Sequence, residues 1–340
     1  MTEKASFPIG LDHDRTAKDF ARGIRLASKG HYREALRCFD KVLFMAPAHL
    51  DALNGRGDCL ALLGRQEEAI AAYDKLLASR PHDTNARNSK ASALKSAGRL
   101  DEAVAEYDEV VKVDPNHIEA LFNRGNAYLD LGRPNEAIQD LRRALSLQPY
   151  DTEIHTSLIF ALNFDTEATT ASQQAERAKW AAHLGRSASA SHPNQRSANR
   201  KLRIGYVSSH FRHQAGTYAF GGVIVNHDPE QFEIICYSDT PEEDDLSSYL
   251  RNKAEKWSRT IELSDDQLAD LVRKDRIDIL VDLVGHMKGN RLRVFALKPA
   301  PIQVTAWGEP TSTGLKAVDY LFAPCAGPHT RTAVARRTDC

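Results

Sequence analysis

The stretch GRQEEAIAAYDKLLASRP, residues 64–81, recurs as GRLDEAVAEYDEVVKVDP at 98–115 and as GRPNEAIQDLRRALSLQP at 132–149. A more distant copy, GHYREALRCFDKVLFMAP, occupies 30–47. The opening glycines lie 34 residues apart, and the closing prolines and the alanine five residues after each glycine keep the same spacing. Three series with one period and one phase exclude chance, so the first half of the chain is an array of repeats.

Each repeat is expected to form two antiparallel helices joined by a tight turn. The glycine ends the first helix, where the backbone needs a left-handed angle. The alanine lets the second helix approach the first, an aromatic residue or leucine four positions later fills the interface, and the proline ends the second helix. This is the tetratricopeptide signature, and it predicts an all-α solenoid of four repeats at 16–49, 50–83, 84–117 and 118–151.

The first helix of each repeat carries residues that this packing does not use. They are expected to line a concave face that binds a polypeptide, and they are Asn54, Asp58, Asn88, Ser92, Lys95, Phe122, Asn123, Asn126 and Asp130. An asparagine side chain offers both a donor and an acceptor, so it can bind the backbone of an extended peptide whatever its sequence. The alternative is that each polar residue is simply solvated.

The 34-residue period ends after Asp151. Residues 152–184 keep a helix-like apolar spacing with Trp180 on the apolar side, so they are expected to form helices that cap the repeats. Residues 185–200 are rich in Ser, Asn and Ala and are expected to be a linker between domains. Residues 1–15 precede the repeats as an N-terminal extension.

From Lys201 onwards, short apolar runs alternate with a helical stretch. Strands are expected at 202–209, 232–238, 278–285, 302–308 and 318–323. A helix is expected at 264–276, with Ser264 as its N-cap and two aspartates in its first turn. The alternation predicts a Rossmann-like α/β domain with a doubly wound parallel sheet over 201–323.

Loops with glycine and polar or basic residues follow three of these strands, at 208–218, 285–291 and 308–314. Ligands of doubly wound sheets bind beyond the carboxyl ends of the strands, so the loops predict a site for a polar ligand. His213 and His286 are candidates for a general base or for a donor to a sugar or phosphate. Alternatively, each is a loop histidine bonded to the backbone, and Lys288 and Arg291 are plain surface charges.

Length and composition limit the function classes. The 340 residues suit two domains, and 45 Lys and Arg against 46 Asp and Glu argue against nucleic-acid binding. No apolar run is long enough to cross a membrane, and no signal or transit peptide is evident, so a cytoplasmic protein is expected. Five scattered cysteines suggest neither disulfides nor a metal site, and Cys38 and Cys59 are expected to be small core residues.

The order of parts resembles the O-linked N-acetylglucosamine transferase family, in which tetratricopeptide repeats precede a two-lobed GT-B glycosyltransferase. The resemblance is carried by KLRIGYVSSHF (201–211), FEIICYSD (232–239), RIDILVDLVGHMKGNR (276–291), FALKPAPIQVTAWG (295–308) and TSTGLKAVDYLFA (311–323). SLIFALNFD at 157–165 is similar to the bacterial, SPINDLY-like form of the family. Residues 201–323 are therefore identified with the first GT-B lobe.

The resemblance implies that N-acetylglucosamine passes from UDP-GlcNAc to Ser or Thr of a polypeptide that the repeats bind, with no cofactor. It suggests His213 and His286 as catalytic candidates, and Thr217, Tyr218, Lys288, Pro310, Thr313 and Gly314 as substrate-binding candidates. The sequence departs from the family pattern where His210 replaces an aspartate, Gln214 a histidine and Thr311 a glycine. The asparagine ladder of animal members is only partly present, with Asn123 in its usual place.

The resemblance also predicts a second lobe that holds the nucleotide, whereas 17 residues follow Ala323. Residues 324–340 lack helix or strand periodicity and are expected to be an irregular tail read in a shifted frame. A truncated transferase, weakly active or inactive alone, is expected. The alternatives are a non-enzymatic repeat scaffold that binds proteins, or a second chain that supplies the missing lobe. An exposed apolar face on the first lobe would favour oligomers.

Overall fold

The computed structural model describes residues 9–184, 192–195, 197, 199–306, 312–324 and 332–336. The chain divides into two compact units, Met1–Pro149 and Tyr150–Cys340. The boundary lies two residues before the predicted end of the fourth repeat, whereas the sequence predicts it in the linker at 185–200. Among the described helices, none combines the length and the apolar character that a membrane crossing requires.

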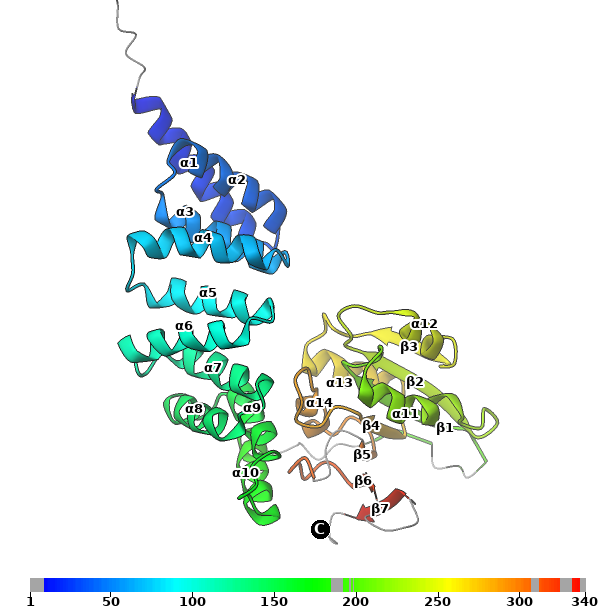
Figure 1. The fold of residues 1–340 in the computed structure, drawn as a ribbon. Coiled ribbons are helices and arrows are strands. Elements are labelled where there is room, and N and C mark those ends of the chain that lie inside the picture. Colours follow the sequence, from blue (N-terminus) through cyan, green and yellow to red (C-terminus); the bar gives the residue numbers. More distant parts are fainter. Residues whose placement is uncertain are drawn as a thin grey trace, which may run out of the picture. The chain divides into compact units, whose positions relative to one another are not determined.

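Helices α1 to α8 form the first unit and follow one another in pairs, as the repeat period predicts (Figure 1). Their bounds are α1 Ile9–Ala27, α2 Tyr32–Met45, α3 Leu50–Leu62, α4 Gln66–Ser79, α5 Thr84–Ser96, α6 Leu100–Val113, α7 Ile118–Asp130 and α8 Pro134–Leu147. Helix α1 begins inside the segment 1–15, where an extension is predicted. The first repeat therefore has a longer first helix than the others.

The residues that mark the period have the roles that the sequence predicts. The turn glycines all have left-handed backbone angles, with φ between 70° and 78°, and are Gly30, Gly64, Gly98 and Gly132. The periodic alanines are fully buried, and so are the side chains four positions later, which are Phe39, Tyr73, Tyr107 and Leu141. A Cβ on Gly57 would lie 2.6 Å from the Tyr73 ring, so this pair of helices packs in contact. Cys38 and Cys59 are buried, as expected.

A ladder of ion pairs joins the second helix of each repeat to the first helix of the next. The pairs are Asp40–Arg56, Asp74–Lys90 and Asp108–Arg124, each 34 residues from the next, with N–O distances of 2.8, 2.7 and 2.7 Å. Lys90 and Arg124 also bind carboxylates of their own repeat, Glu106 at 2.6 Å and Asp140 at 2.7 Å. Each of these two cations therefore lies between two acidic side chains and connects neighbouring repeats.

The second unit begins with helices α9 Thr152–Leu162 and α10 Thr170–His183. Their buried side chains Ile159 and Trp180 belong to the same hydrophobic cluster as Leu280 of the sheet. The sequence predicts that 152–184 caps the repeats, and this role stays a prediction, but Ile159 and Trp180 of these helices are buried in the core of the second unit. Helical spacing identifies an apolar face without identifying the surface that covers it.

A mostly parallel sheet forms the centre of the second unit. Its strands are β1 Leu202–Ser208, β2 Phe232–Ser238, β3 Lys256–Arg259, β4 Ile279–Asp282, β5 Ile302–Ala306, β6 Tyr320–Pro324 and β7 Thr332–Arg336, in the order β3-β2-β1-β4-β5-β6-β7. Neighbours from β3 to β6 pair in parallel, and in the central register Ile204 of β1 pairs with Ile234 and Ile279. The predicted parallel sheet is confirmed.

Strands β3 and β7 are absent from the sequence prediction. Strand β3 has the sequence KWSR, which is too short to show an alternating pattern. Strand β7 lies in the segment 324–340, where an irregular tail is predicted, and it pairs antiparallel with β6, with Leu321 opposite Ala335. This pairing shows that part of the tail continues the sheet.

Helices cover both faces of the sheet (Figure 1). The remaining helices are α11 Ala215–Val225, α12 Asp245–Arg251, α13 Asp265–Lys274 and α14 Leu292–Ala296. Helices α11 and α12 bury apolar side chains against Ile204 and Cys236, whereas α9, α10, α13 and α14 share a cluster with Val207 and Ile235. Ser264 caps α13 through a capping box, as predicted. The domain is therefore doubly wound.

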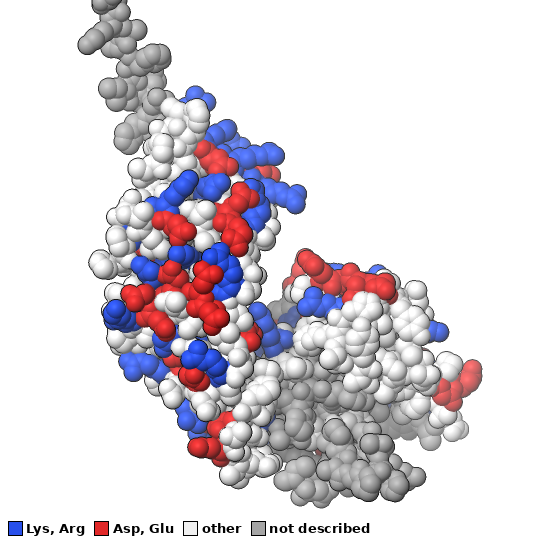
Figure 2. All heavy atoms as spheres, in the orientation of Figure 1, with Lys and Arg blue, Asp and Glu red and all other residues white. Residues whose placement is uncertain are grey.

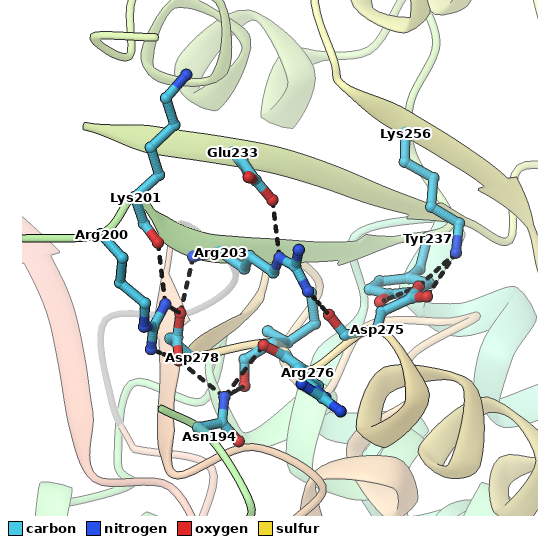
Figure 3. A network of polar contacts seen from close by, with 11 residues as sticks. Asn194, Arg200, Lys201, Arg203, Glu233, Tyr237, Lys256, Asp275, Arg276 and Asp278 are labelled. Atoms are coloured by element: carbon cyan, nitrogen blue, oxygen red, sulfur yellow. Dashed lines mark hydrogen bonds and ion pairs between the residues drawn. The ribbon is translucent and has the colours of Figure 1, made fainter. Parts of the chain in front are cut away.

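At the amino edge of the sheet, Asp278 anchors the residues that precede β1 (Figure 3). Its buried carboxylate accepts two hydrogen bonds from Arg200, at 2.6 Å each, and one from Asn194 Nδ2 at 2.8 Å. The backbone N–H of Arg203 also donates to it, at 2.9 Å. Arg200 and Asn194 belong to the predicted linker at 185–200, so the described part of that segment is attached to the sheet.

The ion-pair ladder predicts unequal losses of stability. Replacing Arg124 by Met leaves the nearly buried Asp140 without its cation, so Arg124→Met should lower the free energy of unfolding by about 3 kcal/mol. Arg56→Met removes a pair with the half-exposed Asp40 and should cost less than about 1 kcal/mol. Urea unfolding followed by helical circular dichroism measures both free energies. Equal losses in the two variants would contradict the prediction, because they would show that burial of the acidic partner does not change the contribution of an ion pair.

Candidate functional site

Polar side chains gather where the parallel strands of the second unit end. Strands β1, β2 and β4 end in Ser208, Ser238 and Asp282, and all three side chains are buried. The loops at 208–218 and 285–291 follow β1 and β4 and therefore begin at the same edge. This is the edge at which doubly wound sheets bind their ligands.

Asp282 fixes the start of the loop after β4. Its carboxylate accepts hydrogen bonds from Thr305 Oγ1 at 2.7 Å and from the backbone N–H groups of Val284 and Gly285 at 3.1 and 3.0 Å. Burial raises the pKa of Asp282, and these donors oppose the rise. Gly285 has a φ of 61°, a backbone angle that glycine adopts without strain. The loop thus leaves the strand in a defined direction.

Arg291 fixes the end of the same loop. Its guanidinium donates to both oxygens of Asp239, at 2.9 and 3.0 Å, and to Asp265 Oδ1 at 2.9 Å. It also donates to the backbone carbonyls of Thr260 and Leu263. The alternative that Arg291 is a plain surface charge is therefore wrong, because this side chain joins three loops at the carboxyl edge.

His286 lies between these two anchors and is buried. Its Nε2 is 2.9 Å from the carbonyl oxygen of Thr313, and its ring packs edge to face on Trp180 with centroids 4.6 Å apart. Burial lowers the pKa of His286 to about 3, so the ring is neutral at pH 7 and Nε2–H donates to the carbonyl. The structure agrees with the alternative of a backbone-bonded histidine. A catalytic role for His286 stays a prediction.

Thr313 and Gly314 line a cavity of about 280 Å³ in the second unit. Other lining residues include Gln174 and Ala178 of α10, Thr305 of β5, Tyr320 of β6, and Asp319 directly before β6. Gly314 has a φ of 78°, and a Cβ there would lie 2.6 Å from the Arg177 carbonyl oxygen, so glycine is required. Pro310, another predicted substrate-binding residue, lies outside the described residues. Two of the predicted substrate-binding residues, Thr313 and Gly314, therefore lie at the wall of a cavity.

His213 and Tyr218 form an exposed polar group at the start of α11. His213 Nδ1 is 2.7 Å from Tyr218 Oη, and His213 Nε2 is 2.8 Å from Asp245 Oδ1. The backbone N–H of His213 donates to Asp244 Oδ2 at 2.7 Å. The structure therefore brings two predicted site residues into contact and adds Asp245, which the sequence reasoning missed. Asp245 is near in space although it is 32 positions away.

Thr217 and Lys288 have different surroundings. Thr217 is buried, and its hydroxyl donates to the carbonyl oxygen of His210. This contact orients the loop after β1, and the substrate contact predicted for Thr217 stays a prediction. Lys288 is exposed on the loop between Asp282 and Arg291, where its ammonium group is accessible to a ligand.

One cluster in the described part of the chain has the residue types of a metal site, namely His213, Asp244 and Asp245. Asp244 is the N-cap of α12 and accepts from Ser247, so its oxygens already have donors. These hydrogen bonds hold the pKa of Asp244 down, at about 2, chiefly through the backbone N–H of His213. We assign no metal to this group, because its hydrogen bonds account for its geometry.

In the repeats, two of the predicted groove residues bind tyrosines of the packing interface. Asp58 Oδ1 accepts from Tyr73 Oη at 2.7 Å, and Ser92 Oγ is 2.9 Å from Tyr107 Oη. Burial raises the pKa of Asp58, and the tyrosine hydroxyl opposes the rise. Asp58 and Ser92 occupy the same repeat position, and the fourth repeat pairs Asn126 with Leu141 there, without a hydroxyl. These polar residues are thus explained in part by packing.

The other groove candidates bind their neighbours along the first helices. Two of these contacts are short: Asn54 Nδ2 donates to Asp58 at 3.0 Å, and Asn126 Nδ2 donates to the Phe122 carbonyl at 2.9 Å. Three are longer: Asn88 Nδ2 lies 3.5 Å from Glu119, Asn123 Nδ2 lies 3.5 Å from Ser92, and Lys95 lies 3.6 Å from Asp130. The contacts at 3.5 Å and above are weak enough to be exchanged for a ligand. Asn88 is buried, whereas Asn123 is half-buried, so Asn123 is the better placed of the two to bind a peptide.

The sequence reasoning also missed two periodic features. The first is the ion-pair ladder, and the second is a series of N-caps, in which His49, Asp83, His117 and Asp151 cap the first helices of successive repeats and of α9. Both keep the 34-residue spacing. A search for every residue type at each repeat position, rather than for the signature alone, would have found them.

Comparisons with known proteins match both parts of the chain. The family model described as glycosyl transferase family 41 matches residues 143–331, and a tetratricopeptide repeat model matches 20–84 and 88–152. The solved structure of an O-GlcNAc transferase mutant from Thermobaculum terrenum has a TM-score of 0.65 and 28% identity, and the match covers 94% of this chain and 54% of that chain.

Curated relatives include two plant proteins. A probable UDP-N-acetylglucosamine–peptide N-acetylglucosaminyltransferase SEC from Arabidopsis thaliana is 37% identical over 123 residues, which is 36% of this chain and 13% of that protein. A probable enzyme of the same kind, SPINDLY from Hordeum vulgare, is 37% identical over 131 residues, which is 37% of this chain and 14% of that protein. The matched part is thus a small share of these relatives and about half of the solved structure.

The surroundings of His286 predict a pH dependence. An unfolded histidine binds a proton near pH 6.5, whereas His286 in the folded unit stays neutral to about pH 3, so stability falls as pH drops through this range. His286→Gln removes this titrating group, so the free energy of unfolding of the variant should fall less steeply with pH than that of the wild type, by about 1.4 kcal/mol per pH unit. All three tryptophans, at positions 180, 257 and 307, belong to the second unit, so tryptophan fluorescence during urea unfolding isolates it. An unchanged slope between pH 6 and 4 would contradict the prediction.

Proposed function

Because this chain belongs to glycosyl transferase family 41, we propose that it takes part in transferring N-acetylglucosamine from UDP-GlcNAc to Ser or Thr residues of polypeptides. The observation that carries the proposal is the family match over 143–331, a range that includes the carboxyl-edge loops and the cavity at Thr313. The names of the plant relatives support the donor and the peptide acceptor.

The repeats indicate a protein–protein interaction, which is the general role of such arrays. We assign the acceptor polypeptide to the first-helix face that carries the half-buried Asn123. Its weak contact with Ser92 leaves an amide group that can bind a peptide backbone. The compartment that fits this role and the five scattered cysteines is the cytoplasm.

The second unit supplies the residues that meet the reacting groups. Transfer to a hydroxyl needs a proton acceptor, and of the two predicted histidines His213 is the accessible one, with half of its side chain exposed. Asp245 can offset the charge that His213 gains with a proton. His286 is better suited to positioning, because it joins the loop after β4 to Thr313. Lys288, on that same loop, is available to an anionic group of the donor.

The test is a transfer assay with the purified chain, labelled UDP-GlcNAc and a lysate as the source of acceptors. Label should enter proteins slowly, because weak activity is expected of this chain alone, but in proportion to the chain added. Lys288→Ala should lower that rate roughly tenfold through loss of one charged contact. The matched control is Lys274→Ala, which removes an exposed lysine from α13 and should leave the rate unchanged.

The outcomes separate the two functions that the sequence suggests. Labelling that is sensitive to Lys288 supports the transferase. Polypeptides that co-purify with the chain but acquire no label would contradict the proposal and favour a non-enzymatic repeat scaffold. Equal effects of Lys288→Ala and Lys274→Ala would contradict the assignment of Lys288 to the site.

A further inference from the structure

The junction between the first and second repeats contains a cavity of about 360 Å³. Its lining residues, which we call the arginine groove, are Arg33, Leu36, Arg37, Asp40, Leu63 and Arg65. Leu36 is buried and Leu63 is half-buried, so they form an apolar floor between charged walls. The groove lies between α2 and the end of α3, away from the first-helix asparagine to which the acceptor is assigned.

Two cations of the groove lack partners in the described part of the chain. Arg65 forms a bidentate pair with Glu68, with both distances 2.7 Å, and Asp40 binds Arg56 at 2.8 Å. Arg33 and Arg37 are exposed, and neither forms an ion pair or a side-chain hydrogen bond with another described residue. The groove therefore carries two uncompensated positive charges.

The repeat period shows that these charges depart from the pattern of the array. The position of Arg33 holds Glu67 in the second repeat, and Glu67 binds Arg99 of the next repeat at 3.1 Å. In the third repeat the same position holds Asp101, whose negative charge favours the charged form of Arg133 in the next repeat. The later junctions thus pair an acid with an arginine. The first junction instead places Arg33 beside Arg65, where the pattern has opposite charges.

The whole first repeat shares this positive charge. Residues 16–49 contain seven Lys and Arg against three Asp and Glu, whereas 50–83 contain four against six. Figure 2 shows Lys and Arg gathered over α1 and α2, and Asp and Glu prominent over the helices that follow. The charge of the array therefore changes sign after its first repeat.

We propose that the arginine groove binds a short acidic segment of a partner polypeptide. Carboxylates of the segment would pair with Arg33 and Arg37, and one apolar side chain would cover Leu36 and Leu63. Long polyanions fit this surface less well, because a nucleic acid or an anionic membrane would also face the acidic repeats. The proposal concerns a separate face of the repeats and does not depend on sugar transfer.

The test is fluorescence anisotropy with a labelled peptide of Glu-Glu-Leu units, and a Gln-Gln-Leu peptide as the neutral probe. The variant is Arg33→Glu with Arg37→Ala, which gives the first repeat the residues that the second carries at Glu67 and Ala71. It should fold, as circular dichroism would verify, and bind the acidic peptide roughly tenfold more weakly. The control is Lys75→Glu with Arg142→Ala, which makes the same charge change at exposed positions elsewhere.

The proposal is supported if the wild-type chain binds the acidic peptide, releases it at high salt, and binds the neutral peptide poorly, with the loss confined to the groove variant. Equal weakening in the control would show a general charge effect and overturn the groove assignment. Absence of peptide binding would also overturn it. So would sedimentation that showed dimers sensitive to the groove variant in place of peptide binding.

Discussion

In three of the four repeats, a bulky side chain of the second helix presses against a glycine of the first helix, and in the third repeat the buried Ala91 takes the place of this glycine. A Cβ on Gly23 would lie 2.8 Å from the Phe39 ring, and one on Gly125 would lie 3.0 Å from Leu141. This contact sets the distance between the helices of a pair, and the left-handed turn glycine makes the reversal possible. It also limits the ligand face, because a tyrosine at this position takes Asp58 or Ser92 as the partner of its hydroxyl. Packing therefore decides which polar residues stay available to a bound peptide.

The second unit depends on a comparable constraint at the carboxyl edge of its sheet. Asp282 and Arg291 fix the two ends of one loop, and His286 connects its middle to Thr313. All three side chains are largely buried and hydrogen-bonded. They therefore fix the shape of the site and present little accessible surface to a substrate. Of the accessible side chains, Lys288 lies on the loop that these anchors hold, and His213 lies on the loop after β1, where its backbone N–H donates to Asp244. Such a division between buried supports and exposed contacts is what a preorganised site requires.

Much of the fold could be predicted because its signals are local or periodic. The turn glycines, the buried alanines and the Ser264 cap follow from residues close in sequence, and the parallel sheet follows from alternating strands and helices. The features that the sequence did not predict depend on contacts between segments that are far apart in the chain. Helices α9 and α10 show an apolar face in the sequence, yet only the fold reveals that Trp180 packs on His286. Strand β7 pairs through its backbone, and Asp245 reaches His213 across 32 positions, so neither leaves a local pattern.

The central claim is that a polypeptide held by the repeats is the acceptor served by the carboxyl edge of the second unit. Hydrogen–deuterium exchange with mass spectrometry tests it most directly, using a Ser- and Thr-rich peptide at saturating concentration together with UDP-GlcNAc. The account predicts slower exchange in the first helices α5 and α7 and in the loops at 208–218 and 285–291, with no change at the Asp278 edge. Protection confined to one unit, or absent from both, would contradict it.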